Sequence, residues 1–118
     1  MEQTYEVHYT DEAEAMLSRI QDRRVQRKLA DLADSLGQDP EARGKALLRD
    51  LFGFRSLRAI GQRYRIVYLV DTSNLQVVII GIGIRKEGDR DDIYEKVRRV
   101  VRTFKTVLEP AKEPKGSK

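Results

Sequence analysis

Apolar and polar residues alternate at the start of the chain and then change to helical spacing. Residues 4–10 place three apolar side chains on one face, which predicts a first strand: Tyr5, Val7 and Tyr9. Apolar positions at helical spacing then predict two amphipathic helices, over about 11–20 and 25–36, with Gly37 placed to end the second. Because the break between them is so short, we expect a helical hairpin that lies on a sheet.

Three strand candidates follow in succession, over about 55–59, 63–70 and 75–84. Residues 61–62 and 71–74 are turn-rich, and connections this short predict antiparallel neighbours. Apolar residues then recur at helical spacing to the end of the folded part: Ile93, Val97, Val100, Val101 and Phe104. They predict a C-terminal helix.

The predicted element order is therefore β-α-α-β-β-β-α. This order is typical of an α+β fold, an antiparallel sheet with the N-terminal helical hairpin packed on one face and a C-terminal helix. We expect a single domain over residues 1–109 and a disordered tail over 110–118, which is rich in Lys, Pro, Glu and Gly. The second face of the sheet would stay partly open, and a site could be built there.

Composition limits the chemistry that the chain can perform. It has no cysteine and one histidine, which excludes disulfides, thiolate zinc sites and His-rich metal sites, so neither a metal nor another cofactor is expected. No apolar run approaches the ~20 residues of a membrane span, so we expect a cytoplasmic protein without a membrane partner. Any chemistry would use Arg, Lys, Tyr, Asp or Glu.

Charge is divided unevenly along the chain. Residues 1–42 hold five Lys or Arg against ten Asp or Glu, whereas residues 43–102 hold fourteen against seven. Within the basic part, four arginines occur in eleven residues without an acidic neighbour: Arg55, Arg58, Arg63 and Arg65. A second group, Arg85 and Lys86, follows the last strand. Cationic side chains from two neighbouring strands indicate a polyanionic ligand such as nucleic acid.

Strand parity selects two of these arginines. Arg65 lies on the face opposite Tyr64 in the second of the three strands, and Arg85 has the parity of Gly81 and Gly83 in the third. Glycines in a strand mark a close approach, so we interpret this pair as clearance for a ligand beside Arg85. The alternative is tight packing of a helix against the two glycines.

Four motifs in order resemble the RelE/ParE toxin superfamily. They are Tyr-Glu-Val-His-Tyr at 5–9, Leu-Gly-Gln-Asp-Pro at 36–40, Leu-Arg-Ala-Ile-Gly-Gln-Arg-Tyr-Arg-Ile-Val-Tyr at 57–68, and Gly-Ile-Arg-Lys-Glu at 83–87 before Ile-Tyr. The resemblance covers roughly residues 4–104, and the fold of that family has the element order predicted above.

The resemblance to the RelE-like branch implies a site at named positions. Arg65, Arg85 and Tyr94 match the catalytic pattern, while Arg55 and Arg58 would hold RNA phosphates. The charge pattern, apart from the resemblance, adds Lys86 and the peripheral Arg63 as candidates for phosphate binding. The chain has arginines where the nuclease pattern has lysines, and an insertion separates Arg85 from Tyr94. Tyr94 therefore fits either a site residue or an ordinary helix-face residue.

The resemblance further implies a toxin of a type II toxin–antitoxin system. In the RelE-like branch this is a ribosome-dependent mRNA endoribonuclease, which works without metal by attack of a ribose 2′-OH on the next phosphate. Its partners would be a cognate antitoxin, the ribosome and mRNA. The alternatives are a ParE-like toxin that inhibits DNA gyrase by binding, and a small basic RNA-binding module without toxicity.

Overall fold

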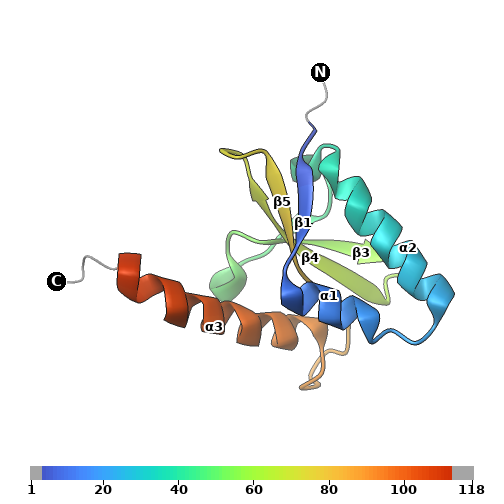
Figure 1. Ribbon diagram of the computed structural model, residues 1–118. Helices are drawn as coiled ribbons and strands as arrows, with labels where there is room; N and C mark the ends of the chain where they lie inside the picture. The colour runs from blue at the N-terminus through green and yellow to red at the C-terminus, as the bar shows by residue number, and fades with distance from the viewer. Residues whose placement is uncertain (1–3, 113–118) are drawn as a thin grey trace.

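The computed structural model describes residues 4–112, with side chains as far as Thr103, and has an α+β fold (Figure 1). Within this part, five strands form one sheet in the order β1-β5-β4-β3-β2. The strands are β1 (Glu6–Tyr9), β2 (Lys45–Ala46), β3 (Arg55–Ala59), β4 (Tyr64–Asp71) and β5 (Gln76–Ile84). The helices are α1 (Asp11–Ser18), α2 (Arg23–Asp34) and α3 (Ile93–Lys112), with a 3₁₀ turn η3 (Arg49–Leu51) before β3. The predicted fold class and the order of the main elements are confirmed.

The sheet differs from the predicted one at its two edges. The β3–β4–β5 meander is antiparallel as expected, but β1 pairs with β5 in parallel, so the sheet is mixed. The hairpin α1–α2 lies between β1 and the meander in sequence, and such a long crossover permits a parallel neighbour. The two-residue strand β2 pairs with β3 inside a segment that the sequence indicated only as a connection.

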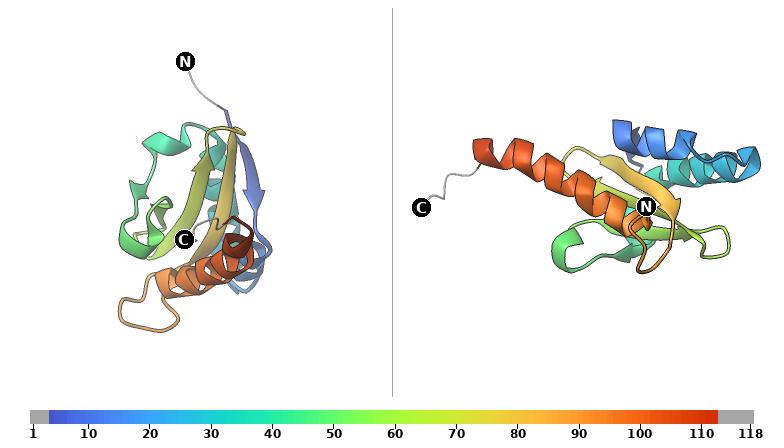
Figure 2. Two further views of the ribbon diagram at one scale, coloured as in Figure 1. Left: turned by 90° about the vertical axis from the view of Figure 1, so that its left-hand side faces the viewer. Right: turned by 90° about the horizontal axis from the view of Figure 1, so that it is seen from below.

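Two apolar cores lie on opposite sides of the sheet. The hairpin α1–α2 covers one face with Leu29, Ala33 and Leu36, which pack on Ile66 and Tyr68 of β4. On the other face α3 and η3 pack on the sheet, through Ile93, Val97, Val101 and Leu51 against Val67 and Ile80. The views in Figure 2 show α3 crossing the sheet and projecting beyond it. The sequence predicted that this second face of the sheet stays partly open, and α3 and η3 cover part of it.

A bulge in β5 changes which side chains share a face. Val67 is opposite Gly81, whereas the next residue, Tyr68, is opposite Ile79, so Ile80 has no partner in β4. An extra residue in one strand reverses the alternation beyond it. Ile79 therefore packs in the α1–α2 core, and Ile80 packs in the α3 core. An unbroken alternation along β5 predicts that Ile79 shares a face with Gly81, Gly83 and Arg85, and this prediction is wrong for Ile79 because of the bulge.

The two glycines of β5 make room for α3. A Cβ at Gly81 would lie 2.7 Å from Val97 Cγ2 and 3.3 Å from Ile93 Cδ1, and one at Gly83 would lie 3.2 Å from Ile93 Cδ1. The interpretation of these glycines as clearance for a ligand is wrong, and helix packing, the alternative, is correct. The side chain of Arg85 nevertheless emerges just beyond them.

The C-terminal helix is longer than the sequence indicated. It runs through residues 110–112, where the predicted tail begins, and residues 113–118 of that tail lie outside the described residues. Within residues 4–112, no helix combines the length and apolar composition needed to cross a bilayer.

We predict that Gly81→Ala destabilises the protein by about 1–3 kcal/mol through overpacking. The β-branched Val97 has little rotamer freedom with which to move away, and the clash outweighs the about 0.4–1 kcal/mol that Gly→Ala gains from the unfolded chain. Urea unfolding measures the change. Gly83→Ala should cost less than half as much, because its only contact under 3.4 Å is with Cδ1, the flexible end of Ile93, at 3.2 Å. Equal stabilities of Gly81→Ala and the wild type would contradict the packing of α3 described here.

Candidate polyanion-binding groove

A groove of about 670 Å³ opens where β2, β3 and β4 meet the start of α3. Four of the residues singled out from the sequence line it: Arg58, Arg65, Arg85 and Tyr94. Ser56, Lys45 and Glu87 also line it. The structure thus brings together four side chains from β3, β4, the end of β5 and α3. The first and last of them, Arg58 and Tyr94, are 36 positions apart in the sequence.

Strand register places the arginines of the groove side by side. Arg58 of β3 is the direct cross-strand partner of Arg65 of β4, and Arg65 is in turn opposite Gly83 of β5. The backbone N–H of Arg85 donates to the carbonyl oxygen of Arg63, which fixes the end of β5 beside the β3–β4 turn. Like charges directly opposite each other destabilise a sheet. Their pairing here indicates a role other than stability.

Arg58 and Arg65 are each anchored through a single nitrogen, Nη1, in the part of the chain that the structure describes. Arg58 Nη1 donates to Gln62 Oε1 at 3.1 Å. Arg65 Nη1 donates to the carbonyl oxygens of Gln62 and Tyr64. Gln62 has a left-handed backbone (φ 68°) in the tight turn, and this turn presents its side chain and its carbonyl to two different arginines. A guanidinium has five N–H donors, so such anchoring fixes its direction and leaves N–H groups for a ligand.

Arg85 is held by a buried carboxylate. Its Nη1 lies 2.7 Å from Oδ1 of Asp92, whose side chain is 3% exposed, whereas Glu87 is at 3.9 Å and exposed. Hydrogen bonding to Asp92 raises the pKa of Arg85 despite its partial burial. Burial alone would raise the pKa of Asp92, but hydrogen bonds from Arg85 and from the backbone of Lys86 and Tyr94 lower it below the usual range. Both groups are therefore charged at neutral pH.

Tyr94 reaches the groove across the insertion. Its hydroxyl lies 2.8 Å from the hydroxyl of Ser56, a buried residue of β3. The guanidinium carbon of Arg85 lies 4.9 Å from the centroid of its ring, which is cation–π contact. Of the two alternatives left open by the sequence, Tyr94 thus takes the groove position, while its ring also contributes to the α3 core.

Three predicted phosphate-binding residues lie elsewhere. Arg55 is on the other face of β3, opposite Tyr68, and donates to the carbonyl oxygens of Arg43 and Gly44. Arg63 is exposed in the turn between β3 and β4 and does not line the groove. Lys86 lines a separate hollow of about 440 Å³ between α1 and α3.

Two residues that line the groove, Lys45 and Ser56, and one that lies behind it, Asp92, were missed in the sequence. Lys45 belongs to a two-residue strand, too short to give a periodic signal. Ser56 differs from its neighbours only by burial, which one sequence does not reveal. Asp92 carried a signal, because an Asp just before an apolar helical pattern is a favoured N-cap. Its second role, as the partner of Arg85, depends on the tertiary fold.

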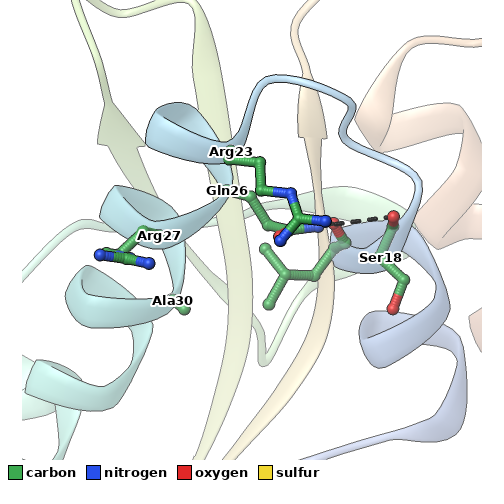
Figure 3. A pocket seen from close by; sticks show the side chains of 6 residues that line it. Ser18, Arg23, Gln26, Arg27 and Ala30 are labelled. Carbon is green, nitrogen blue, oxygen red and sulfur yellow. Dashed lines mark hydrogen bonds between the residues drawn. The ribbon is translucent and has the colours of Figure 1, made fainter.

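A hollow of about 410 Å³ between α1 and α2 contains two further arginines, Arg23 and Arg27 (Figure 3). Its central polar group, the Gln26 amide, donates to the carbonyl oxygens of Leu17, Ser18 and Ile20 and so holds the end of α1. These contacts serve the hairpin itself. Among the described residues, no group of His, Cys, Asp or Glu side chains is placed to hold a metal ion. The groove beside α3 is therefore the strongest candidate site.

Comparisons with known proteins agree with this fold. Residues 7–89 match the family described as the ParE toxin of the type II toxin–antitoxin system parDE. The chain is also similar to one in the RelBE2 toxin–antitoxin complex of Mycobacterium tuberculosis, at 30% identity and a TM-score of 0.64. That match covers 70% of this chain and 93% of the other. No curated protein matches the chain in sequence.

More distant structures share the fold. A mutant of the Escherichia coli toxin RelE in the free state has 19% identity and a TM-score of 0.62, over 85% of this chain and 98% of that one. The YoeB/ParE toxin from Agrobacterium tumefaciens has 22% identity and a TM-score of 0.58, over 69% and 99%. At these identities the likeness supports the fold alone.

We predict that the stabilising effect of the Asp92 charge disappears in acid. Because the folded-state pKa of Asp92 is lowered, its contribution is complete above the unfolded-state pKa of about 3.9 and is lost as the pH falls through the folded-state value. At pH 7 we expect Asp92→Asn to lower the free energy of unfolding by about 1.5–3 kcal/mol, as for a hydrogen bond between charged groups. Urea unfolding at a series of pH values measures the difference from the wild type. That difference should shrink below about pH 4, and an unchanged difference at low pH would show that charge is not its source.

Proposed function

The chain belongs to the ParE toxin family of type II toxin–antitoxin systems, within the RelE/ParE superfamily, and we propose that its toxic activity is ribosome-dependent cleavage of mRNA in the cytoplasm. The observation that carries this proposal is the groove, where guanidinium groups from three strands converge: Arg58, Arg65 and Arg85. Arg58 and Arg65 are direct cross-strand neighbours. Among the described residues, two carboxylates form ion pairs with these three arginines, and both contact Arg85: the buried Asp92 at 2.7 Å and the exposed Glu87 at 3.9 Å. A phosphodiester would relieve this repulsion.

Cleavage would follow the route open to a site without metal. The ribose 2′-OH attacks the adjacent phosphate, the bond to the 5′ oxygen breaks, and the products are a 2′,3′-cyclic phosphate and a free 5′-OH. Arg65 and Arg85 would bind the non-bridging oxygens, whose charge grows in the transition state, and their anchored geometry means that little reorganisation is needed. Arg58 would hold the flanking phosphate.

Proton transfer requires groups other than arginine, which stays protonated. Tyr94 and Lys45 are the titratable donors of the groove that suit this task. The Tyr94 hydroxyl is oriented by Ser56, and Lys45 is exposed at the edge strand β2. No histidine lies among the described residues that line the groove, so the site would work slowly on free RNA. Alignment of the message by the ribosome would supply what the side chains lack.

A cognate antitoxin is part of the proposal. The Mycobacterium tuberculosis relative was solved as a toxin–antitoxin complex. The cationic groove of this chain would attract an acidic segment of such a partner, which would then compete with RNA for Arg58 and Arg65.

The second candidate is inhibition of DNA gyrase by binding, which is favoured by the description of the matching family as ParE. It needs no reactive groove, so substitutions that leave the fold intact separate the two activities. A gyrase inhibitor would block supercoiling in a purified assay and leave translated messages whole.

We predict that Arg65→Ala lowers the rate of message cleavage about 100-fold, the loss typical of removing one donor to a developing anion. Purified protein added to a cell-free translation reaction, followed by primer extension on the message, measures the rate. Arg24→Ala, which removes an exposed arginine from α2, serves as the control and should keep the wild-type rate. Circular dichroism confirms that both variants are folded.

The alternative hypothesis, inhibition of DNA gyrase, predicts a different result in these assays. If the folded wild-type protein leaves messages intact and inhibits supercoiling, or if Arg65→Ala cleaves as fast as the wild type, the proposed nuclease activity is wrong.

A further inference from the structure

One buried charged side chain, Asp92, stands behind the groove and takes no part in the cleavage described above. Among the described residues it is the only buried charged side chain, with 2% of the residue exposed. A buried carboxylate needs compensating partners, and here every partner belongs to the segments that frame the groove.

The two oxygens of this carboxylate serve different elements. Oδ2 accepts from the backbone N–H of Tyr94 at 3.0 Å, which caps the first turn of α3. Oδ1 accepts from Arg85 Nη1 at 2.7 Å and from the backbone N–H of Lys86. One side chain therefore joins the end of β5 to the start of α3 across the 87–91 loop.

Helix capping alone does not explain this arrangement. Asp22 caps α2 in the ordinary way: its Oδ1 accepts from Arg24 N–H at 3.0 Å and from Val25 N–H at 3.4 Å, and the residue is exposed. Asp92 performs the same task with one oxygen while its other oxygen is directed at a groove arginine. The bond to Arg85 is therefore additional to the cap.

Through these bonds Asp92 determines where two groove residues lie. Arg85 is held on one side by the carboxylate and rests on the Tyr94 ring, and the Tyr94 hydroxyl meets Ser56. An arginine side chain otherwise samples many rotamers. Losing the carboxylate would release the guanidinium and shift the first turn of α3, on which Tyr94 is carried.

We propose that Asp92 is a positioning residue of the groove, which holds the Arg85 guanidinium and the Tyr94 ring in the geometry required for reaction at a phosphodiester; the kinetic part of this inference rests on the proposed function. The carboxylate also offsets part of the charge of Arg85. Its removal would therefore leave phosphate binding unchanged or stronger while it lowers the rate of the chemical step.

The test compares Asp92→Asn with Asp22→Asn, a matched change of a capping aspartate away from the groove. In ribosome-dependent cleavage with purified protein, Asp92→Asn should lower kcat about 10- to 100-fold, as expected for misplacement by about 1 Å, with KM unchanged or lower. Asp22→Asn should keep both constants within about twofold. A purely structural role would predict the same small effect for both variants once each is shown to be folded, and a wild-type kcat in folded Asp92→Asn would overturn the proposal.

A double-mutant cycle shows whether Asp92 acts through Arg85. In an Arg85→Ala background the further change Asp92→Asn should lower kcat clearly less than it does in the wild type, because only Tyr94 remains of the two groups that Asp92 positions. Independent, multiplicative losses from the two substitutions would contradict the proposal.

A measurement without RNA separates this inference from the proposed function. In ¹⁵N NMR relaxation, the Nε–Hε group of Arg85, assigned by its loss in Arg85→Lys, should be as rigid as the backbone in the wild type and in Asp22→Asn. It should become mobile in Asp92→Asn. If the wild type does not cleave RNA but Arg85 loosens in this way, the nuclease proposal fails and the positioning role stands; equal rigidity in all three proteins refutes the positioning role.

Discussion

The close packing of α3 on the glycine-lined end of β5 is the constraint on which the candidate site depends. Gly81 and Gly83 let Ile93 and Val97 approach the sheet backbone to within a distance that a Cβ would block. This approach brings the first turn of α3 beside β3, where the Tyr94 hydroxyl meets Ser56. Without the two glycines the helix would stand further off and the groove would lose one wall.

The same contact concentrates charge. The bulge at Ile80 and the two glycines turn an apolar side of β5 toward α3. Arg85 directly follows the last residue of β5 and lies beside the first turn of α3. Arg58 and Arg65 arrive at the same place by cross-strand register. Anchors from Gln62 and Asp92 hold the guanidinium groups in place against their mutual repulsion. The result is a fixed cluster of cations, which is suited to a polyanion and costly for a protein that has no use for one.

Much of the fold was predictable because it follows local periodicity. The bounds of β3 agree with the prediction, and those of β4 and β5 agree to within one residue at each end, since turn residues and apolar runs mark their ends clearly. The parallel edge strand β1 was not predictable, because pairing between segments distant in sequence depends on how the hairpin α1–α2 folds over the sheet. The face of Ile79 relative to Gly81 was misjudged because one unpaired residue, Ile80, reverses the alternation, and no residue type indicates a bulge.

The candidate site was predictable in part for a related reason. Arg58, Arg65, Arg85 and Tyr94 could be selected by a resemblance and by strand parity, and the structure brings them together. Arg55 was selected by the resemblance and by charge, and Arg63 and Lys86 were selected by charge alone. Neither criterion distinguishes an arginine that donates to backbone carbonyls, as Arg55 does, from one that faces a ligand. Asp92 was recognisable as part of a helix start, whereas its bond to Arg85 arises only when β5 and α3 meet.

The chemistry of the cut ends tests the central claim most directly. Messages recovered from a cell-free translation reaction that contains the purified protein can be treated with enzymes specific for cyclic phosphate and for 5′-OH ends and then sequenced. The account predicts cuts in translated messages only, each leaving a 2′,3′-cyclic phosphate and a 5′-OH. Intact messages in the presence of folded, growth-arresting protein would contradict it.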